Sequence, residues 1–264
     1  MEKIVISSTR NSRISEVLEL KEKSRERRAK GLIVVEGLRE IMMALSAGYS
    51  IDTLFAYENL GGFERFKAIH DLPKRVCTVS ADVFAKMAYR ENSDGLLALI
   101  PLHNLKLKEV RLSKKPFVII LESVEKPGNL GAILRTADAA KVDAVVICDP
   151  LTDLYNPNVI RSSIGCIFMQ QVVACSSQDA LQWLRIKGIK AFAAELEAAQ
   201  CYHETDFTQS SAIIMGTEAE GLSDFWLQEA DARIKIPMRG KIDSLNVSVS
   251  TAILTFEAMR QRGF

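Results

Sequence analysis

Polar side chains gather in three stretches of the second half of the chain, and each stretch follows a short apolar run. The stretches are residues 122–139, 215–224 and 236–250. Glycines in the first two allow close backbone approach to a ligand, and free amides at a helix start suit an anion. The five side chains that could act on such a ligand are Asn129, Arg135, Glu218, Ser244 and Asn246. They predict a ligand site formed by the three stretches.

Each stretch also has a purely structural interpretation. A glycine-rich turn between a strand and a helix is routine in α/β proteins, and Ser244 or Asn246 is a suitable cap for the last helix. Glu218 can be a solvated loop acid, and Arg135 a surface charge on a helix. The first stretch is neither a P-loop, because no Lys-Ser/Thr follows its glycines, nor a GxGxxG dinucleotide fingerprint.

The cysteines and histidines give no sign of a metal centre. Five cysteines are scattered without a CxxC pair, and the three histidines stand alone. This pattern predicts free thiols in a reducing compartment and no zinc site. The amino-terminal residues turn polar too early for a signal peptide, and no apolar run approaches membrane-spanning length. We therefore expect a cytoplasmic protein without a bound metal.

The elements that must position the five side chains are apolar strands alternating with helices. Such alternation predicts an α/β fold with a parallel sheet covered on both faces, whose ligands lie beyond the carboxyl ends of the strands. The expected strands are 117–122, 143–149, 167–175, 190–196, 211–216 and 232–238. The expected helices are 128–140, 178–187 and 244–262.

The first half predicts a smaller α/β domain. We expect a domain at 1–105, a polar linker at 106–116 and the parallel-sheet domain at 117–264. The expected strands of the first domain are 32–36, 51–57, 75–79 and 95–101. Its expected helices are 12–31, 37–48, 62–70 and 80–88.

Basic residues are concentrated in the first half. Residues 1–110 hold 18 basic and 15 acidic side chains, a net charge of +3, whereas the whole chain has a net charge of +1. The segment 21–30 alone holds six basic and two acidic side chains. It is either a solvated helix or a surface that follows phosphates. The candidate contacts for a polyanion are Lys23, Arg27, Lys30 and Arg39.

Taken in order, the three stretches are more specific than any one of them. NLGAILRTA, GTEAEGL and IPMRGKIDSLNVSVSTAILTFEAMRQR resemble the three motifs of the SpoU family, 2′-O-ribose RNA methyltransferases that use S-adenosyl-L-methionine. KGLIVVEGLREIMMAL resembles the family's amino-terminal domain, which binds substrate RNA. The resemblance implies a deep trefoil knot in the carboxy-terminal domain and a homodimer formed through it.

The resemblance also implies residue roles. Asn129, Arg135, Glu218, Ser244 and Asn246 match the catalytic positions, and the backbone of Gly216, Ile236 and Leu245 matches positions that hold the methyl donor. The resemblance implies ribosomal or transfer RNA as the partner. Two departures concern loop shape: Ala219 follows Glu218 where many members have glycine, and Glu125-Lys126 precedes Pro127 where the motif often has aspartate.

Physical chemistry constrains the role of Arg135. A guanidinium is a poor base, because its pKa exceeds ~12. We expect it to grip a phosphate and stabilise a developing alkoxide. The alternative to an enzyme is a non-catalytic RNA-binding or assembly factor on the same fold. The absent dinucleotide fingerprint disfavours an oxidoreductase.

Overall fold

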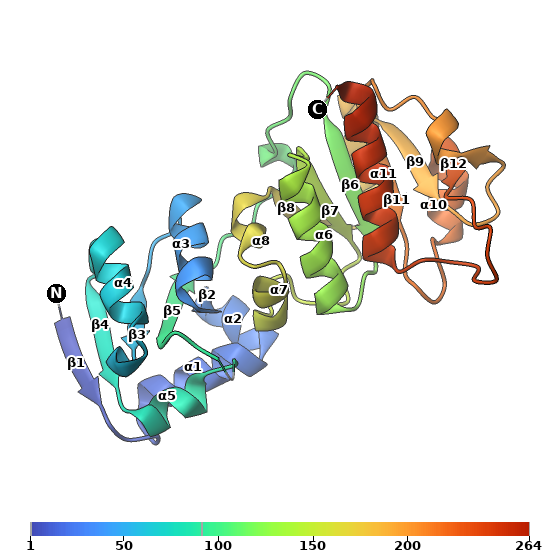
Figure 1. Ribbon diagram of the computed structural model, residues 1–264. Helices are drawn as coiled ribbons and strands as arrows, with labels where there is room; N and C mark the ends of the chain where they lie inside the picture. The colour runs from blue at the N-terminus through green and yellow to red at the C-terminus, as the bar shows by residue number, and fades with distance from the viewer. Residues whose placement is uncertain (1, 91, 264) are drawn as a thin grey trace. The chain divides into compact units, whose positions relative to one another are not determined.

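Two compact units make up the computed structural model, which describes residues 2–90 and 92–263 (Figure 1). The first unit contains residues 1–103 together with 153–169, and the second contains 104–152 together with 170–264. Two features differ from a linear division with a linker at 106–116. The segment 153–169 groups with the first unit, and Val110, inside the expected linker, is buried in the core of the second.

The first unit is a mixed sheet with helices on both faces. Its strand order is β1-β4-β3-β5-β2, and β5 runs antiparallel to both of its neighbours. The strands are β1 (Glu2–Ile6), β2 (Leu32–Glu36), β3 (Thr53–Ala56), β4 (Arg75–Val79) and β5 (Leu96–Pro101). The helices are α1 (Ser12–Glu22), α2 (Ser24–Lys30), α3 (Leu38–Ser46), α4 (Gly62–Ile69), α5 (Ala81–Met87), α7 (Pro157–Ser162) and α8 (Cys166–Met169), with the 3₁₀ helix η1 (Glu58–Leu60).

The expected helix 12–31 is divided in two by a buried arginine. The side chain of Arg27 is only 2% exposed. Its Nη1 donates to the carbonyls of Leu20 at 2.6 Å and Lys21 at 3.1 Å. Its Nε and Nη2 bind Oδ2 of Asp153 at 2.6 and 2.5 Å. Arg27 therefore satisfies the carbonyl end of α1 after the chain turns at Lys23. Its donors are used internally, which removes it from the expected phosphate-binding surface.

The second unit is a seven-stranded sheet in which every ladder is parallel. Its strand order is β10-β12-β9-β11-β6-β7-β8. The strands are β6 (Phe117–Glu122), β7 (Ala144–Cys148), β8 (Val172–Cys175), β9 (Lys190–Ala194), β10 (Gln200–Cys201), β11 (Ser211–Met215) and β12 (Ala232–Lys235). The helices are α6 (Pro127–Ala139), α9 (Ser177–Lys187), α10 (Asp224–Glu229) and α11 (Val247–Arg262), with the 3₁₀ helices η2 (Leu107–Glu109) and η3 (Tyr202–Glu204).

Helices cover both faces of the parallel sheet, as the continuous apolar strands require. α6 and α11 pack against each other over one face (Figure 1). Side chains of α9 and α10, including Trp183 and Trp226, join those of the central strands in a core on the other face. Both tryptophans are at most 6% exposed, so they are core residues and not platforms for stacking bases.

The expected strand 167–175 was wrong, and several elements were not expected. The expected strand 167–175 is α8 followed by the shorter β8, because Ile167 and Phe168 are buried in the first unit, where α8 packs against α3. Gly165, whose φ is +87°, makes the turn into α8 beside Met43. The strand β1 and the helices α7 and α10 lay outside the expected set. No helix within 2–90 or 92–263 is both long and apolar enough to cross a membrane.

The buried ion pair of Arg27 and Asp153 generates a stability prediction. Replacing Arg27 with alanine leaves a buried carboxylate and two helix-end carbonyls without donors, so the free energy of unfolding should fall by about 3–5 kcal/mol. Chemical denaturation measures the change. The exposed neighbour Arg28 provides the control, and Arg28→Ala should stay within about 0.5 kcal/mol of wild type. Equal effects of the two substitutions would contradict the structural role of Arg27.

Candidate active site

Three loops of the second unit leave the sheet at the same edge. They follow β6, β11 and β12, at residues 123–126, 216–223 and 236–246. β6 pairs in parallel with β11, β11 with β9, and β9 with β12, so the carboxyl ends of these strands point the same way. The parallel register therefore brings together residues as far apart in sequence as Asn129 and Asn246, which are 117 positions apart.

The carboxylate of Glu218 joins all three loops. Nδ2 of Asn129 donates to Oε1 of Glu218 at 2.8 Å, and Nδ2 of Asn246 donates to the same oxygen. Nδ2 of Asn246 also lies 3.2 Å from Oδ1 of Asn129. Nζ of Lys126 pairs with Oε2 of Glu218. Three of the five predicted side chains thus form one hydrogen-bonded cluster.

The electrostatics of the cluster keep its acid ionised. The hydrogen bond from Lys126 is the main reason that the pKa of Glu218 lies below its usual range, and the amide of Asn129 adds to the effect. The same bond raises the pKa of Lys126. Both groups stay charged at neutral pH, so Glu218 acts here as an acceptor that orders the loops.

Asn246 is both a helix cap and a member of the polar cluster, the two roles that the sequence left open. Its Oδ1 accepts from the backbone amide of Ser248 at 3.0 Å and from Oγ of Ser248 at 2.6 Å, which caps α11. Its Nδ2 is directed at Glu218 and Asn129. One carboxamide therefore fixes the start of α11 and joins it to the polar cluster.

Arg135 and Ser244 lie outside the cluster. Arg135 is exposed on α6, six residues and therefore about 120° around the helix axis from Asn129. It forms no hydrogen bond or ion pair with any residue in 2–90 or 92–263. Ser244 is exposed and donates to Oδ1 of Asp243 at 3.2 Å. Both side chains are available to a ligand without breaking a contact to the cluster.

A cavity of about 370 Å³ opens beside Glu218. Its size falls in the range of pockets that hold small molecules. Apolar side chains such as Leu222 and Ile234 meet there with backbone from the second and third loops. The lining includes every predicted donor-binding position, Gly216, Ile236 and Leu245, together with Glu218 and Ser244.

Gly216 is a glycine because the loop folds back on it. A Cβ at Gly216 would lie 2.1 Å from the carbonyl oxygen of Gly221. Two backbone hydrogen bonds close the loop: the amide of Thr217 donates to the Gly221 carbonyl at 2.9 Å, and that of Gly221 donates to the Thr217 carbonyl at 3.2 Å. Gly221 has φ of +70°, a conformation that favours glycine.

Sequence reasoning missed four acidic or basic residues around the site. Lys126 carried no signal beyond its place before Pro127. Glu122, 8% exposed, accepts from the amide and hydroxyl of Ser223 at 2.8 and 2.6 Å and so ties the end of β6 to the second loop. Glu195 and Glu197 line the cavity. The available signal was their position at the carboxyl end of the predicted strand 190–196, where Glu195 is its next-to-last residue and Glu197 follows it.

Among the described residues, no group of three or more histidine, cysteine, aspartate or glutamate side chains is arranged to hold a metal ion. The polar cluster contains carboxamides, one carboxylate and one ammonium group. The hydrogen-bond donors of this cluster can orient the loops and a polar ligand.

Comparison with known proteins identifies the second unit. The model of the SpoU rRNA methylase family matches residues 116–256, more than half of the chain. The chain belongs to the SpoU rRNA methylase family. A second model, the MRM3-like substrate binding domain, matches residues 11–98.

This SpoU family member has relatives along its whole length. It is 33% identical to the 23S rRNA (guanosine(2553)-2′-O)-methyltransferase RlmP of Bacillus subtilis, over 67% of this chain and 70% of that protein. A crystal structure of an RNA 2′-O ribose methyltransferase matches 99% of this chain and 100% of its own, with 37% identity and a TM-score of 0.87. An AdoMet-bound rRNA methyltransferase from Sinorhizobium meliloti covers 98% of both chains at 26% identity, with a TM-score of 0.86.

The basic residues predicted to contact RNA differ from one another in exposure and in ion-pair partners. Lys23 is 58% exposed and lies 3.9 Å from Glu19, and Lys30 is 33% exposed and pairs with Glu16 at 3.2 Å. Arg39 is 58% exposed and binds Glu40. With Arg27 buried, the three others remain candidates for contacts to phosphate.

The ion pair of Lys126 and Glu218 generates a titration prediction. Lys126→Met should raise the pKa of Glu218 toward its usual value, because the strongest hydrogen bond to the carboxylate is lost. A carbon-detected NMR titration of labelled glutamates measures it. Since the folded-state pKa lies below the unfolded one, the interaction stabilises the folded state above the unfolded pKa. That stabilisation disappears as pH falls through the folded pKa.

The control for this titration is Lys241→Met, which removes an exposed lysine from the third loop. The pKa of Glu218 should not move in that variant. If Lys126→Met also leaves it unchanged, the ammonium group does not control the acid.

Proposed function

We propose that this protein transfers a methyl group from S-adenosyl-L-methionine to the 2′-hydroxyl of a ribose in ribosomal or transfer RNA. One observation carries the proposal: hydrogen bonds to Glu218 hold three loops together beside a cavity of about 370 Å³. Membership of the SpoU family supports the reaction class, and the AdoMet-bound relative supports the cofactor.

The cavity fits a ligand that combines apolar and polar parts. Its apolar lining suits a flat base or a methionine chain, and the backbone of Gly216, Ile236 and Leu245 offers amides and carbonyls for specific hydrogen bonds. When bound, S-adenosyl-L-methionine supplies an electrophilic methyl group on a sulfonium. The chain's own part is to align the ribose hydroxyl with that methyl group, a contribution worth about 7–11 kcal/mol when alignment is good.

Arg135 is the residue that we assign to charge on the RNA. Its guanidinium binds a phosphate beside the target ribose and stabilises the negative charge that develops on the 2′-oxygen as the hydroxyl proton passes to solvent water. Ser244, which lines the cavity, holds the ribose. Asn129, Glu218 and Asn246 keep the three loops in register around the reacting groups.

The finer architecture belongs to the same proposal. We propose a trefoil knot in the carboxy-terminal unit, supported by the position of β12 between β9 and β10 after the chain has passed through β11. A homodimer through this unit is supported by Val249 and Phe256, apolar residues of α11 that are 47% and 41% exposed. Domains at 1–105 and 117–264, with the segment 153–169 grouped with the first, and a cytoplasmic location complete it, the last supported by five free cysteines.

Two measurements test the function. Calorimetry of the purified protein with S-adenosyl-L-methionine should show binding, and the protein should methylate RNA taken from cells that lack it. Mapping of 2′-O-methylation with and without the protein then names the nucleotide. RNA binding without cofactor binding or transfer would establish the alternative, a non-catalytic RNA-binding or assembly factor.

Arg135→Lys separates a bidentate contact from simple charge. Lysine keeps the positive charge but loses the planar fork, so kcat should fall roughly 10²–10³-fold, as when a transition-state donor is lost. Affinity for S-adenosyl-L-methionine should be unchanged. Arg185→Lys, an exposed arginine on α9, is the control. Wild-type turnover by Arg135→Lys would overturn the assigned role.

Gly216→Ala tests the cavity. The added Cβ would lie 2.1 Å from the Gly221 carbonyl oxygen, so the second loop must shift and the cavity wall with it. Affinity for S-adenosyl-L-methionine should fall at least about tenfold, the result of losing one well-placed hydrogen bond. Gly240→Ala lies in the third loop, where a Cβ meets nothing within 4 Å, and should bind normally. Normal binding by Gly216→Ala would place the cofactor elsewhere.

A further inference from the structure

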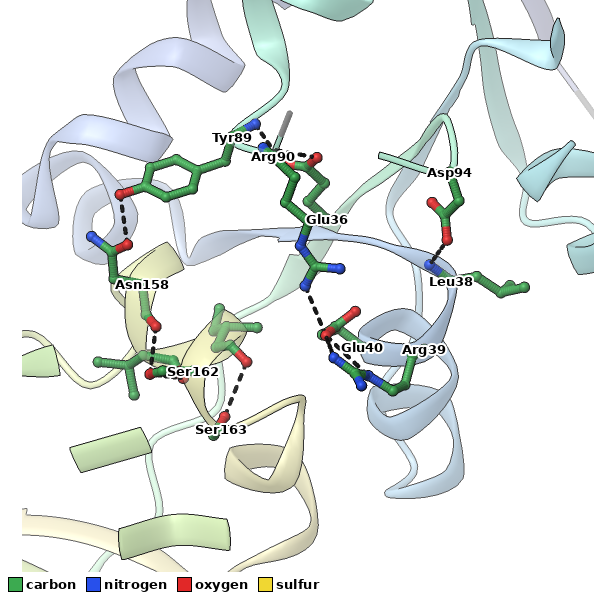
Figure 2. Close-up of polar contacts among 12 residues, drawn as sticks. Glu36, Leu38, Arg39, Glu40, Tyr89, Arg90, Asp94, Asn158, Ser162 and Ser163 are labelled. Atoms are coloured by element: carbon green, nitrogen blue, oxygen red, sulfur yellow. Dashed lines mark hydrogen bonds and ion pairs between the residues drawn. The ribbon is translucent and has the colours of Figure 1, made fainter. Parts of the chain in front are cut away.

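A buried carboxylate in the first unit holds two arginines together. Glu40, on the first turn of α3, is fully buried, and its Oε1 lies 2.8 Å from Nη2 of Arg39 and 2.7 Å from Nη2 of Arg90 (Figure 2). Nε of Arg39 lies 3.2 Å from the same oxygen. Oε2 has no hydrogen-bond partner among the described residues. One carboxylate oxygen therefore organises both guanidinium groups.

The backbone around this carboxylate is shaped to admit it. Gly37, which precedes α3, has φ of +104°, and a Cβ there would lie 2.6 Å from Oε2 of Glu40 and 2.8 Å from Nη1 of Arg90. Only a glycine leaves room for the acid and the arginine together. Burial on its own would raise the pKa of Glu40, but the hydrogen bonds from Arg90 and Arg39 outweigh it and the pKa is lowered. The carboxylate is therefore charged at neutral pH.

The two arginines keep donors for another ligand. Arg39 is 58% exposed and Arg90 is 22% exposed, whereas Glu40 is inaccessible. A guanidinium has five N–H groups, and the contacts to Glu40 use only two of those on Arg39. The three side chains together carry a net charge of +1. This is the donor geometry and charge that bind a phosphate.

Further cations surround Arg90. Glu36 accepts from the backbone amide of Tyr89 at 2.6 Å and from that of Arg90 at 3.4 Å, which fixes the segment carrying both. The ring of Tyr89 lies 5.4 Å from Nζ of Lys21 and 4.9 Å from Cζ of Arg161. Lys21, Arg90 and Arg161 line the same small cavity together with one acid, Glu36, so positive charge predominates beyond the two arginines.

We propose that Arg39 and Arg90 form a binding site for a backbone phosphate of the substrate RNA, and that Glu40 is the positioning residue that holds both guanidinium groups. The proposal rests on the proposed function for the identity of the ligand. It adds to the predicted contact of Arg39 a second arginine and a buried acid. Because Glu40 already holds both guanidinium groups in place, binding a phosphate between them costs little side-chain conformational entropy.

Binding of end-labelled ribosomal RNA fragments to the full-length protein, without cofactor and over a series of salt concentrations, tests the site. Arg39→Gln and Arg90→Gln should each weaken binding roughly tenfold. Each should also reduce the slope of log affinity against log salt by about 0.7 for a lost phosphate contact. Arg185→Gln, which removes a 62% exposed, ion-paired arginine from the second unit, should change neither value.

Glu40→Gln distinguishes positioning from charge. The substitution adds one unit of positive charge, so an effect of charge alone would tighten RNA binding. The positioning role predicts roughly tenfold weaker binding, because the guanidinium groups lose their shared anchor. In a protein that already carries Arg39→Gln and Arg90→Gln, Glu40→Gln should have no further effect on RNA affinity. A further loss there would show that the variant disturbs the fold and would overturn the positioning role.

The outcomes separate this site from the proposed function. If the wild-type protein methylates RNA but Arg39→Gln and Arg90→Gln keep its affinity and salt slope, the site is wrong and the function stands. If the variants behave as expected but no cofactor binding or methyl transfer is found, the site stands and the proposed function fails.

Discussion

The carboxylate of Glu218 receives donors from two other loops, and this contact depends on a parallel sheet that delivers all three loops to one edge. Lys126 and Asn129 come from the loop after β6 and the helix that follows it, and Asn246 comes from the start of α11. A shift of register in β6, β11 or β12 would separate these groups. The site is therefore a property of the sheet, and the loops inherit their positions from it.

The acids of the protein act in different surroundings. Glu218 keeps a 27% exposed side chain, and solvent screens its ion pair, so its contribution is to loop position more than to folding stability. Glu122 and Glu40 are buried, where an unpaired carboxylate is costly, and each is matched with donors. Glu122 binds Ser223, and Glu40 binds two arginines. Burial makes these partners obligatory, whereas those of Glu218 can exchange for a ligand.

Sequence reasoning located the three loops because strand-to-helix turns have strong local signals. The resemblance to the SpoU family supplied the positions Gly216, Ile236 and Leu245, which line the cavity. Sequence reasoning also identified Asn246, although the choice between cap and site was false, since the side chain does both. It did not foresee the burial of Arg27. A run of charges in 21–30 has the pattern of a solvated helix, and nothing local indicates that one guanidinium turns inward to Asp153, 126 residues away.

The remaining errors also come from contacts distant in sequence. The apolar run at 167–175 is typical of a strand, but its first part is buried beside α3 of the first unit and becomes α8. The segment 153–169, which contains that first part, also supplies Arg161 to the surroundings of Tyr89. Division of the chain in sequence order assigns 153–169 to the carboxy-terminal domain. Hydrophobic periodicity indicates which residues are apolar, but it does not indicate which core they join.

The arginines of the two proposed sites differ in how they are held, and the difference divides their tasks. Arg39 and Arg90 are fixed by a buried acid, so their order is already present in the free protein and favours affinity. Arg135 has no hydrogen-bond or ion-pair partner among the described residues, so in the proposed function RNA must order it, with energy that comes from binding elsewhere on the substrate. Binding energy gained at remote groups is a general means of organising a reacting centre. A phosphate site on the first unit would therefore supply binding energy that can order the exposed guanidinium of Arg135.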